Sequence, residues 1–172
     1  MNYMKISIAA LIVTLMLITT SCMEQITPAD NVDLTENIVG NYSGTMIKTS
    51  SSGDDVSATA NIAKITNSSI EISFHCELLD TMITFDLYDN RDSIMVCLTG
   101  DDFDNHYGHS KSGMHHMDDD DDMNDWGHHM DDDHQTGDHH FGGFEMNNHT
   151  FYYSFWDDSQ NKEIFRFEGM KL

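Results

Sequence analysis

Paired histidines set among aspartates are the residues of this sequence best suited to chemistry. Ten of the chain's 11 histidines lie between residues 101 and 149, and the unit His-His-Met-Asp-Asp-Asp occurs there twice, starting at His115 and at His128. A third pair is His139-His140. Neutral imidazole is the commonest side-chain ligand for zinc, copper and nickel, and a pair supplies two donors close together. The repeat therefore predicts a segment that binds transition-metal ions.

The expected ligands combine imidazoles, thioethers and carboxylates from this one segment. Thioether sulfur suits copper(I), whereas a carboxylate completes a coordination shell or orients a ligating imidazole. Copper, zinc or nickel is thus the expected cofactor, and two repeat units with a third pair favour a buffer for several ions over one rigid site. The candidate ligands are His106, His109, Met114, His115, His116, Met117, His128, His129, Met130, Asp131, Asp133, His134, His139 and His140.

Three other interpretations of this segment stay open. Calcium fits less well, because an EF-hand-like loop starting at Asp120 has Asp125 at its sixth position instead of Gly and Asp131 at its twelfth instead of Glu. A disordered, solubilising loop is a second interpretation, since dense charge of one sign opposes folding. Histidines in an acidic field would also gain protons between about pH 8 and 5. Charge alone would serve a solubilising loop, so the repeated histidine pairs favour metal over that interpretation.

The first residues have the features of a secretory signal. Lys5 precedes an apolar run from Ile6 to Ile18 that is shorter than the roughly 20 residues a membrane-spanning helix needs. Thr19-Thr20-Ser21 then stands before Cys22, which resembles the relaxed lipobox of Bacteroidetes lipoproteins and implies that Cys22 carries lipid. The alternative is a secreted protein cleaved near Ser21. We expect a lipid-anchored protein of the bacterial cell envelope, at the outer membrane on its periplasmic or surface face.

Charge and chain organisation limit the partners. The net charge of −22 excludes nucleic acid and anionic lipid head groups as electrostatic partners, because both bind basic surfaces. Metal cations are the natural partners, and membrane contact is expected only through the N-terminal lipid. After the signal peptide over 1–22 we expect a tether over 23–37 and a β domain over 38–172, which the acidic segment 101–149 interrupts.

Alternation of apolar and polar residues predicts about seven short strands and no helix. The clearest case is 70–76, where Ile70, Ile72 and Phe74 alternate with polar residues, as expected for a strand with one buried face. Residues 83–87 and 94–98 predict a hairpin. This spacing is typical of an all-β antiparallel meander that forms a small barrel or sandwich. The other strands are expected over 40–46, 56–65, 150–156 and 163–171.

Two short stretches carry a family resemblance. The opening 39–45, Val-Gly-Asn-Tyr-Ser-Gly-Thr, and the closing 165–171, Phe-Arg-Phe-Glu-Gly-Met-Lys, resemble the calycin-like, or lipocalin-like, lipoprotein domains of Bacteroidetes. The resemblance covers 38–98 and 150–172 and implies an up-and-down barrel of about eight strands that holds a small apolar ligand. With seven strands predicted, an eighth lies within the insertion or the sheet stays open. No ligand residue carries over, because the insertion departs from the family.

The resemblance adds two further hypotheses for function. The first is a carrier of a small apolar ligand, in which the acidic segment is a lid or a solubiliser. The second is a structural surface lipoprotein that binds no small ligand. Metal binding by the histidine-rich segment remains the leading hypothesis, because neither the carrier nor the structural hypothesis accounts for the repeated histidine pairs.

The cysteines and motifs give no support to catalysis. A disulfide between Cys76 and Cys97 is one alternative in a compartment that permits disulfides, but free thiols are expected, because one strand separates the two residues and bridged Cα atoms lie within about 7 Å of each other. Alternation also places Cys97 on the face opposite Val96 and Leu98. Neither HExxH nor GxSxG occurs, and the aspartate runs fit solvated charge better than an acid/base pair. The sequence therefore predicts a binding protein rather than an enzyme.

Overall fold

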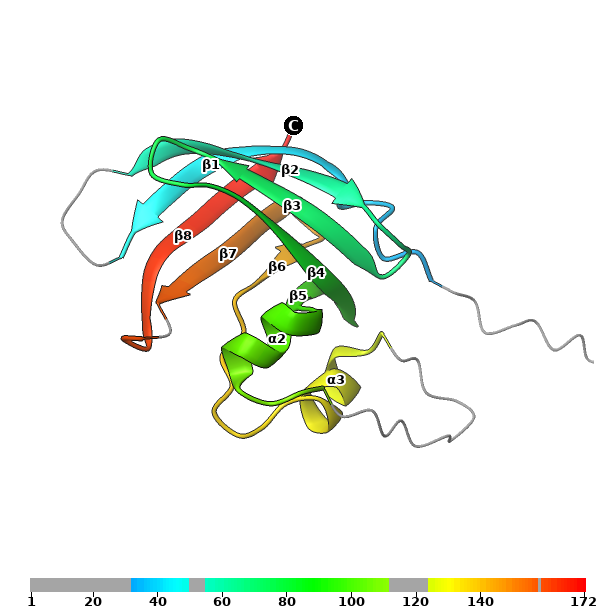
Figure 1. Cartoon of the computed structure of the whole chain (residues 1–172). Coiled ribbons are helices and arrows are strands. Elements are labelled where there is room, and N and C mark those ends of the chain that lie inside the picture. The colour runs from blue at the N-terminus through cyan, green and yellow to red at the C-terminus, as the bar shows by residue number, and fades with distance from the viewer. Residues whose placement is uncertain (1–31, 50–54, 112–123, 158) are drawn as a thin grey trace, which may run out of the picture. The chain divides into compact units, whose positions relative to one another are not determined.

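The computed structural model describes residues 32–49, 55–111, 124–157 and 159–172. Its eight antiparallel strands form a closed barrel in which each strand pairs with the next and β8 pairs with β1 (Figure 1). The predicted all-β antiparallel fold is confirmed. The strands are β1 (Gly40–Lys48), β2 (Val56–Lys64), β3 (Ser69–His75), β4 (Asp80–Asn90), β5 (Ser93–Leu98), β6 (Gly142–Glu145), β7 (Thr150–Asp157) and β8 (Lys162–Lys171).

The chain contacts the barrel before β1 begins. The predicted signal peptide, with Cys22, lies outside the described residues. Within the segment expected to be a tether, Leu34 is buried and its N–H donates to Asn67 O at 2.9 Å, while Asp33 pairs with Lys64. The chain is therefore fixed to the barrel from Asp33 onward. No helix among the described residues is long and apolar enough to cross a bilayer.

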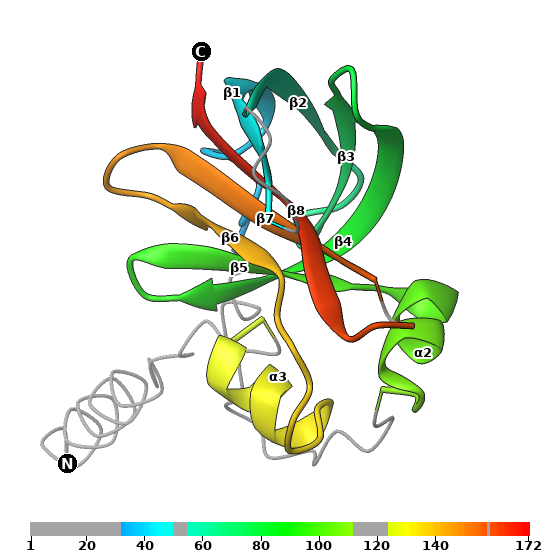
Figure 2. The ribbon, with the colours of Figure 1, turned by 90° about the vertical axis from the view of Figure 1, so that its left-hand side faces the viewer.

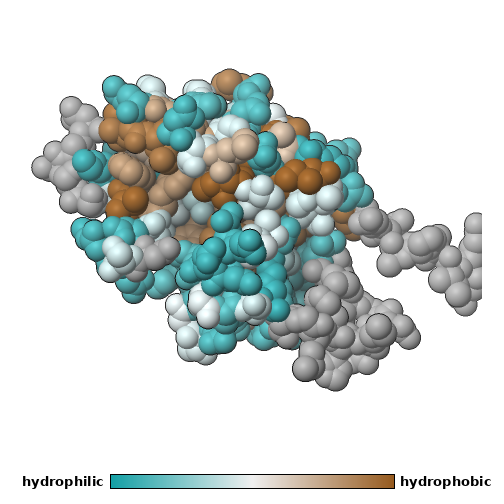
Figure 3. Space-filling view, viewed as in Figure 1, coloured by the Kyte–Doolittle hydropathy of each residue, from teal (hydrophilic) through white to brown (hydrophobic). Residues whose placement is uncertain are grey.

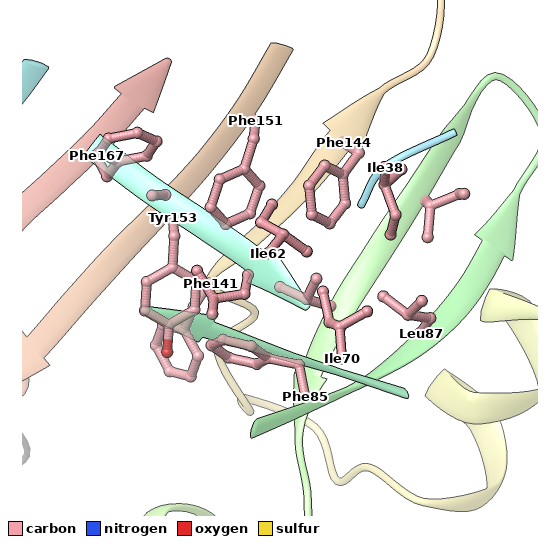
Figure 4. Packing of buried hydrophobic residues seen from close by; sticks show 14 of the residues in the cluster. Ile38, Ile62, Ile70, Phe85, Leu87, Phe141, Phe144, Phe151, Tyr153 and Phe167 are labelled. Atoms are coloured by element: carbon pink, nitrogen blue, oxygen red, sulfur yellow. The ribbon is translucent and has the colours of Figure 1, made fainter. Parts of the chain in front are cut away.

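Aromatic rings fill the barrel interior. Phe74 is fully buried, and its ring centroid lies 6.1 Å from that of Phe151 and 5.6 Å from that of Phe167. Figure 4 shows the rings of Phe151 and Phe144 beside each other, with Ile62 close to both. Large rings packed in this way contribute most of the buried apolar surface of a small barrel. A pocket of about 230 Å³ is lined mostly by apolar residues, together with His106 and Ser154.

The segment between β5 and β7 contributes the eighth strand and two short helices, α2 (Gly100–Tyr107) and α3 (Trp126–Asp132). Strand β6 pairs with both β5 and β7 and completes the barrel. Of the two alternatives, an eighth strand within the insertion or an open sheet, the eighth strand is therefore confirmed. The prediction of no helix is wrong, because α2 and α3 are helical. Local signals explain α3, because the Asp125 side chain accepts from Gly127 N at 2.8 Å and from His128 N at 3.3 Å, an N-cap.

The helices and the residues after α3 cover the outer side of β4 and β5. Both helices lie on the same side of the barrel in two perpendicular views (Figures 1 and 2). Tyr88 of β4 and Cys97 of β5 are buried, although each sits next to inward-facing residues of its strand. The surface over α2 is mostly hydrophilic, and apolar side chains gather over the strands above it (Figure 3). This part of the barrel wall is therefore covered on both faces.

The two ends of the undescribed segment 112–123 are both held by β4. Lys111 Nζ donates to Asp86 Oδ2 at 2.7 Å and to the Tyr88 hydroxyl at 3.3 Å. On the other side, Asp89 N donates to Asn124 O at 2.6 Å. Lys111 and Asn124, the described residues on either side of 112–123, thus both contact β4.

Candidate metal centre

Three potential metal ligands, Cys97, His134 and His140, meet between the barrel wall and the segment that follows α3, and a fourth, His129, contacts His134. Cys97 Sγ lies 3.4 Å from His134 Nε2, which lies 2.9 Å from His129 Nε2. Cys97, His134 and His140 each offer a ligand atom, and these atoms all lie within 4.8 Å of one another. We call Cys97, His129, His134 and His140 the Cys/His cluster. Thiolate and imidazole are the donors that zinc and similar metals take in proteins.

The Cys/His cluster is shielded from water. Cys97 is 2% exposed and His129 is 3% exposed, and the His134 side chain is 1% exposed. Both ring nitrogens of His140 are buried and have no hydrogen-bond partner. A buried polar atom without a partner is rare in folded proteins and costs about 1–3 kcal/mol. The His140 ring is therefore in an environment suited to a ligand bond.

The barrel wall positions the first half of the cluster. Cys97 lies on β5, where alternation turns its side chain to the covered outer face. His129 lies on α3, and its ring stacks on Tyr88 of β4 with centroids 3.7 Å apart and an interplanar angle of 13°. This stacking fixes the plane of the His129 ring.

Aromatic residues from both helices position the second half. The His134 ring packs edge-to-face against Phe103 and Tyr107 of α2, at centroid distances of 5.1 and 4.7 Å. The His140 ring packs edge-to-face against Trp126 of α3 at 4.7 Å. Because these rings are large and rigid, they hold the two histidines with little loss of conformational freedom on binding.

Two carboxylates set which nitrogen of each ring faces the cluster. Asp133 Oδ2 lies 3.0 Å from His129 Nδ1, and Asp138 Oδ2 lies 3.0 Å from His134 Nδ1. An ionised carboxylate only accepts hydrogen bonds, so Nδ1 donates in both rings and each neutral ring keeps its lone pair on Nε2. Two lone pairs therefore face each other across 2.9 Å. Such a contact is favourable only when a cation joins it.

Burial opposes a proton as that cation. Desolvation by burial lowers the pKa of His129 to about 3 and of His140 to about 4, and it also lowers the pKa of His134. Burial raises the pKa of the Cys97 thiol to about 12. Without metal the site therefore holds neutral rings and a neutral thiol at neutral pH, and the Cys97 thiol is placed to donate to His134 Nε2 at 3.4 Å.

Three of the residues expected as ligands belong to the cluster, and two others support it. His129, His134 and His140 supply ring nitrogens. Asp133, expected as a ligand, accepts a hydrogen bond from His129 Nδ1 instead. His109, also expected as a ligand, lies 3.0 Å through Nε2 from Asp138 Oδ2.

The remaining expected ligands lie elsewhere or outside the described residues. His139 stacks on Trp156 with centroids 4.7 Å apart, and His106 packs edge-to-face against Phe141 at the same distance. The structure therefore separates the two members of the pair His139-His140. On α3, but outside the cluster, are His128, Met130 and Asp131. Outside the described residues are Met114, His115, His116 and Met117.

Sequence reasoning missed two residues of the site, Cys97 as a donor and Asp138 as a hydrogen-bond acceptor. One signal was the presence of Tyr88 and Cys97 at outward-facing strand positions, which indicates a covered rather than a wet face. A second was the spacing of four residues from histidine to aspartate, which occurs twice in succession, as His129 to Asp133 and His134 to Asp138.

A catalytic triad is an alternative interpretation of this geometry. The contacts run from a possible nucleophile, Cys97, to a possible base, His134, and on to an orienting carboxylate, Asp138. A cysteine nucleophile must be an accessible thiolate. Cys97 is 2% exposed, and burial raises its pKa to about 12. These properties favour metal ligation over nucleophilic catalysis, because bond formation to an ion removes the thiol proton without exposing the sulfur.

Fold and site together define a closed eight-stranded antiparallel barrel with a buried Cys/His cluster on its outer wall. No model of a known protein family, no curated protein and no solved structure matches this chain.

Proposed function

We propose that the protein binds one transition-metal ion, zinc, copper or nickel, through Cys97, His129, His134 and His140. The observation that carries the proposal is the contact between His129 Nε2 and His134 Nε2 at 2.9 Å, on rings whose Nδ1 atoms face carboxylates. Nitrogens on a tetrahedral ion with metal–nitrogen bonds of about 2.05 Å lie about 3.3 Å apart. A separation of the rings by a few tenths of an ångström would let one ion replace the repulsion with two bonds.

The donor set argues against calcium and favours metals of borderline softness. Calcium takes six to eight oxygen ligands. The two carboxylates nearest the cluster, Asp133 and Asp138, face Nδ1 atoms and not the converging Nε2 atoms. A divalent ion with one thiolate and three neutral rings has a net charge of about +1, which the two carboxylates offset.

The proposal also extends to where the ion is bound. The lipobox-like sequence before Cys22 supports a lipid-anchored protein that binds metal outside the cytoplasm. One site with fixed donors differs from the expected buffer for several ions, because rings held by carboxylates and aromatic packing select one geometry. We therefore propose specific binding of a single ion at the cluster.

A pocket supports a second candidate function, a carrier of a small apolar ligand. Its volume is about 230 Å³, and its lining includes Ile83, Phe155 and Trp156. Ligand pockets for drug-sized molecules commonly measure about 300–1,000 Å³. The pocket suits only a small apolar molecule, and quenching of tryptophan fluorescence by such a molecule, lost when Ile83→Phe fills the pocket, would support this candidate.

Calorimetry with variants tests the metal proposal. The full chain in detergent is treated with a chelator and titrated with zinc, copper and nickel, alongside Cys97→Ser, His140→Gln and the control His75→Gln. His75 is exposed on β3 and pairs with Asp80, so its replacement removes a histidine outside the cluster. We expect the tightest binding phase to weaken at least tenfold in both cluster variants and to stay unchanged in the control. A tightest phase that survives both cluster substitutions would overturn the proposal.

A further inference from the structure

We infer that Asp138 is the positioning residue of this metal centre. It holds the proton of His134 on Nδ1, so that Nε2 faces the ion. The same carboxylate oxygen also contacts His109, which follows the end of α2. The predicted effect of Asp138 on metal affinity rests on the proposed function. Its predicted effect on the position of the His134 proton is independent of that function, because this position can be measured without metal.

One oxygen of Asp138 accepts three hydrogen bonds. Oδ2 lies 3.0 Å from His134 Nδ1, 3.0 Å from His109 Nε2 and 2.9 Å from Gln135 N. Burial acts to raise the pKa of Asp138, but the hydrogen bonds from Gln135, His109 and His134 outweigh it, and the pKa is lowered. The three donors around Oδ2 fix the orientation of the Asp138 carboxylate as an acceptor.

The fixed carboxylate decides which His134 atom is available to an ion. With Nδ1 donating to Asp138, the lone pair lies on Nε2, the atom that is 3.4 Å from Cys97 Sγ and 2.9 Å from His129 Nε2. In the other tautomer, an Nε2–H bond would point to where the ion must bind. A metal-ligating histidine whose second nitrogen donates to a carboxylate is also a more basic ligand.

His109 supports the carboxylate from α2. Gly108, with φ 74°, ends α2, and His109 follows with its ring packed edge-to-face against Phe103 at 5.6 Å. Its Nε2 faces Asp138 Oδ2, and its Nδ1 lies 3.3 Å from Ser110 O, so both nitrogens face acceptors. The hydrogen bond to Asp138 raises the pKa of His109. His109, which the sequence predicted as a metal ligand, thus holds Asp138, and Asp138 orients His134.

Asp133 gives the comparison within the same site. It makes the equivalent bond to His129 Nδ1 from four residues along the chain. Asp138, in contrast, connects His134, the turn at Gln135 and the end of α2 through one oxygen. We therefore expect the loss of Asp138 to disturb the cluster more than the loss of Asp133.

The test combines nitrogen-15 NMR of the metal-free full chain with zinc titration. In the wild type we expect the His134 proton on Nδ1. In Asp138→Asn we expect a mixture with the Nε2–H tautomer and a zinc affinity lower by about 10–100-fold, the usual effect of losing such a partner. Asp132→Asn removes the same charge from an exposed position on α3 and should change neither the His134 tautomer nor the zinc affinity. Unchanged amide spectra away from the cluster exclude a folding defect, and Asp138→Glu should recover part of the affinity.

The outcomes are distinguishable. A His134 proton that stays on Nδ1 in Asp138→Asn would overturn the inference, as would an equal loss of zinc affinity in Asp132→Asn. A wild-type protein that has the Nδ1–H tautomer but binds none of the metals would overturn the proposed function and, with it, a role of Asp138 in metal binding.

Discussion

His129 and His134 face each other through the same kind of nitrogen, Nε2, at 2.9 Å. Each ring uses its other nitrogen for a carboxylate, so neither can donate across the contact while both are neutral. A shared proton and a metal ion would both relieve the contact. They differ in the number of protons that the protein releases when metal binds.

Metal binding at pH 7 should release about one proton per ion. The histidines of the cluster are already neutral there, since burial lowers their pKa, whereas the Cys97 thiol, with a pKa of about 12, must lose its proton to ligate. Calorimetry in buffers with different ionisation enthalpies measures this number. Release of two protons would show that a proton occupies the contact between His129 and His134 in the metal-free protein, and Cys97→Ser should release none.

The metal-free protein should lose stability as the pH falls below about 6.5. In the unfolded chain His129 takes up a proton near its ordinary pKa of 6.5, whereas in the folded protein burial lowers this pKa to about 3. The unfolded state therefore binds more protons between these values, and the contribution of His129 is complete above pH 6.5 and is lost as pH falls toward 3. For one histidine, the free energy of unfolding changes by at most about 1.4 kcal/mol per pH unit.

Urea unfolding at pH 7.5, 6 and 5 in the presence of a chelator checks this dependence. His129→Phe preserves a flat ring against Tyr88 and removes the titrating group, so its stability should depend less on pH than that of the wild type. Equal slopes in the two proteins would contradict the prediction.

Bound metal should protect Cys97 from alkylation and raise the unfolding temperature. The ion would join β5 to α3 and to the residues that follow it, so exposure of the thiol requires breaking several ligand bonds. Reaction with iodoacetamide, followed by peptide mass spectrometry, reports Cys97 and Cys76 separately, and both are free thiols. Cys76 serves as the internal control, because its rate should not respond to metal. Equal protection of both cysteines would indicate a general effect on stability instead.

Replacement of Gly44 by Ala should destabilise the closure of the barrel. A Cβ atom at Gly44 would lie 1.9 Å from Glu168 O, a backbone atom of the neighbouring β8, so the two strands must move apart. Overpacking of this kind costs about 1–3 kcal/mol. Denaturant unfolding of Gly44→Ala measures the loss, and Ser43→Ala, at an exposed position on the same strand, should change stability by less than about 0.5 kcal/mol.

Strand positions were predictable because burial on one face leaves a period of two in the sequence. All seven predicted strands appear, including the clearest, now β3. Strand β6 escaped because its four residues, Gly-Gly-Phe-Glu, are too few and too rich in glycine to show alternation. Helix α3 escaped because its one buried residue is His129, so no apolar period marks its inner face.

The site was predictable in composition but not in geometry. Histidine density identified the segment, and three of its histidines meet in the cluster. Nothing local separates His139, which stacks on Trp156, from His140, which turns into the cluster, because the course of the chain into β6 decides between them. Cys97 lies far from the histidines along the chain and joins them only once β5 and the covering segment are in place.

Both ends of the segment 112–123 are held by β4, through Lys111 on one side and Asn124 on the other. A connection whose ends are fixed on one strand can gain or lose residues with little change in closure entropy, because that cost grows only with the logarithm of length. The copy of the His-His-Met-Asp-Asp-Asp unit that starts at His115 lies within it, so we expect this copy to diverge among relatives of this protein while the barrel and the Cys/His cluster stay the same. Variation in length would then concentrate between Lys111 and Asn124 and be absent between His129 and His140.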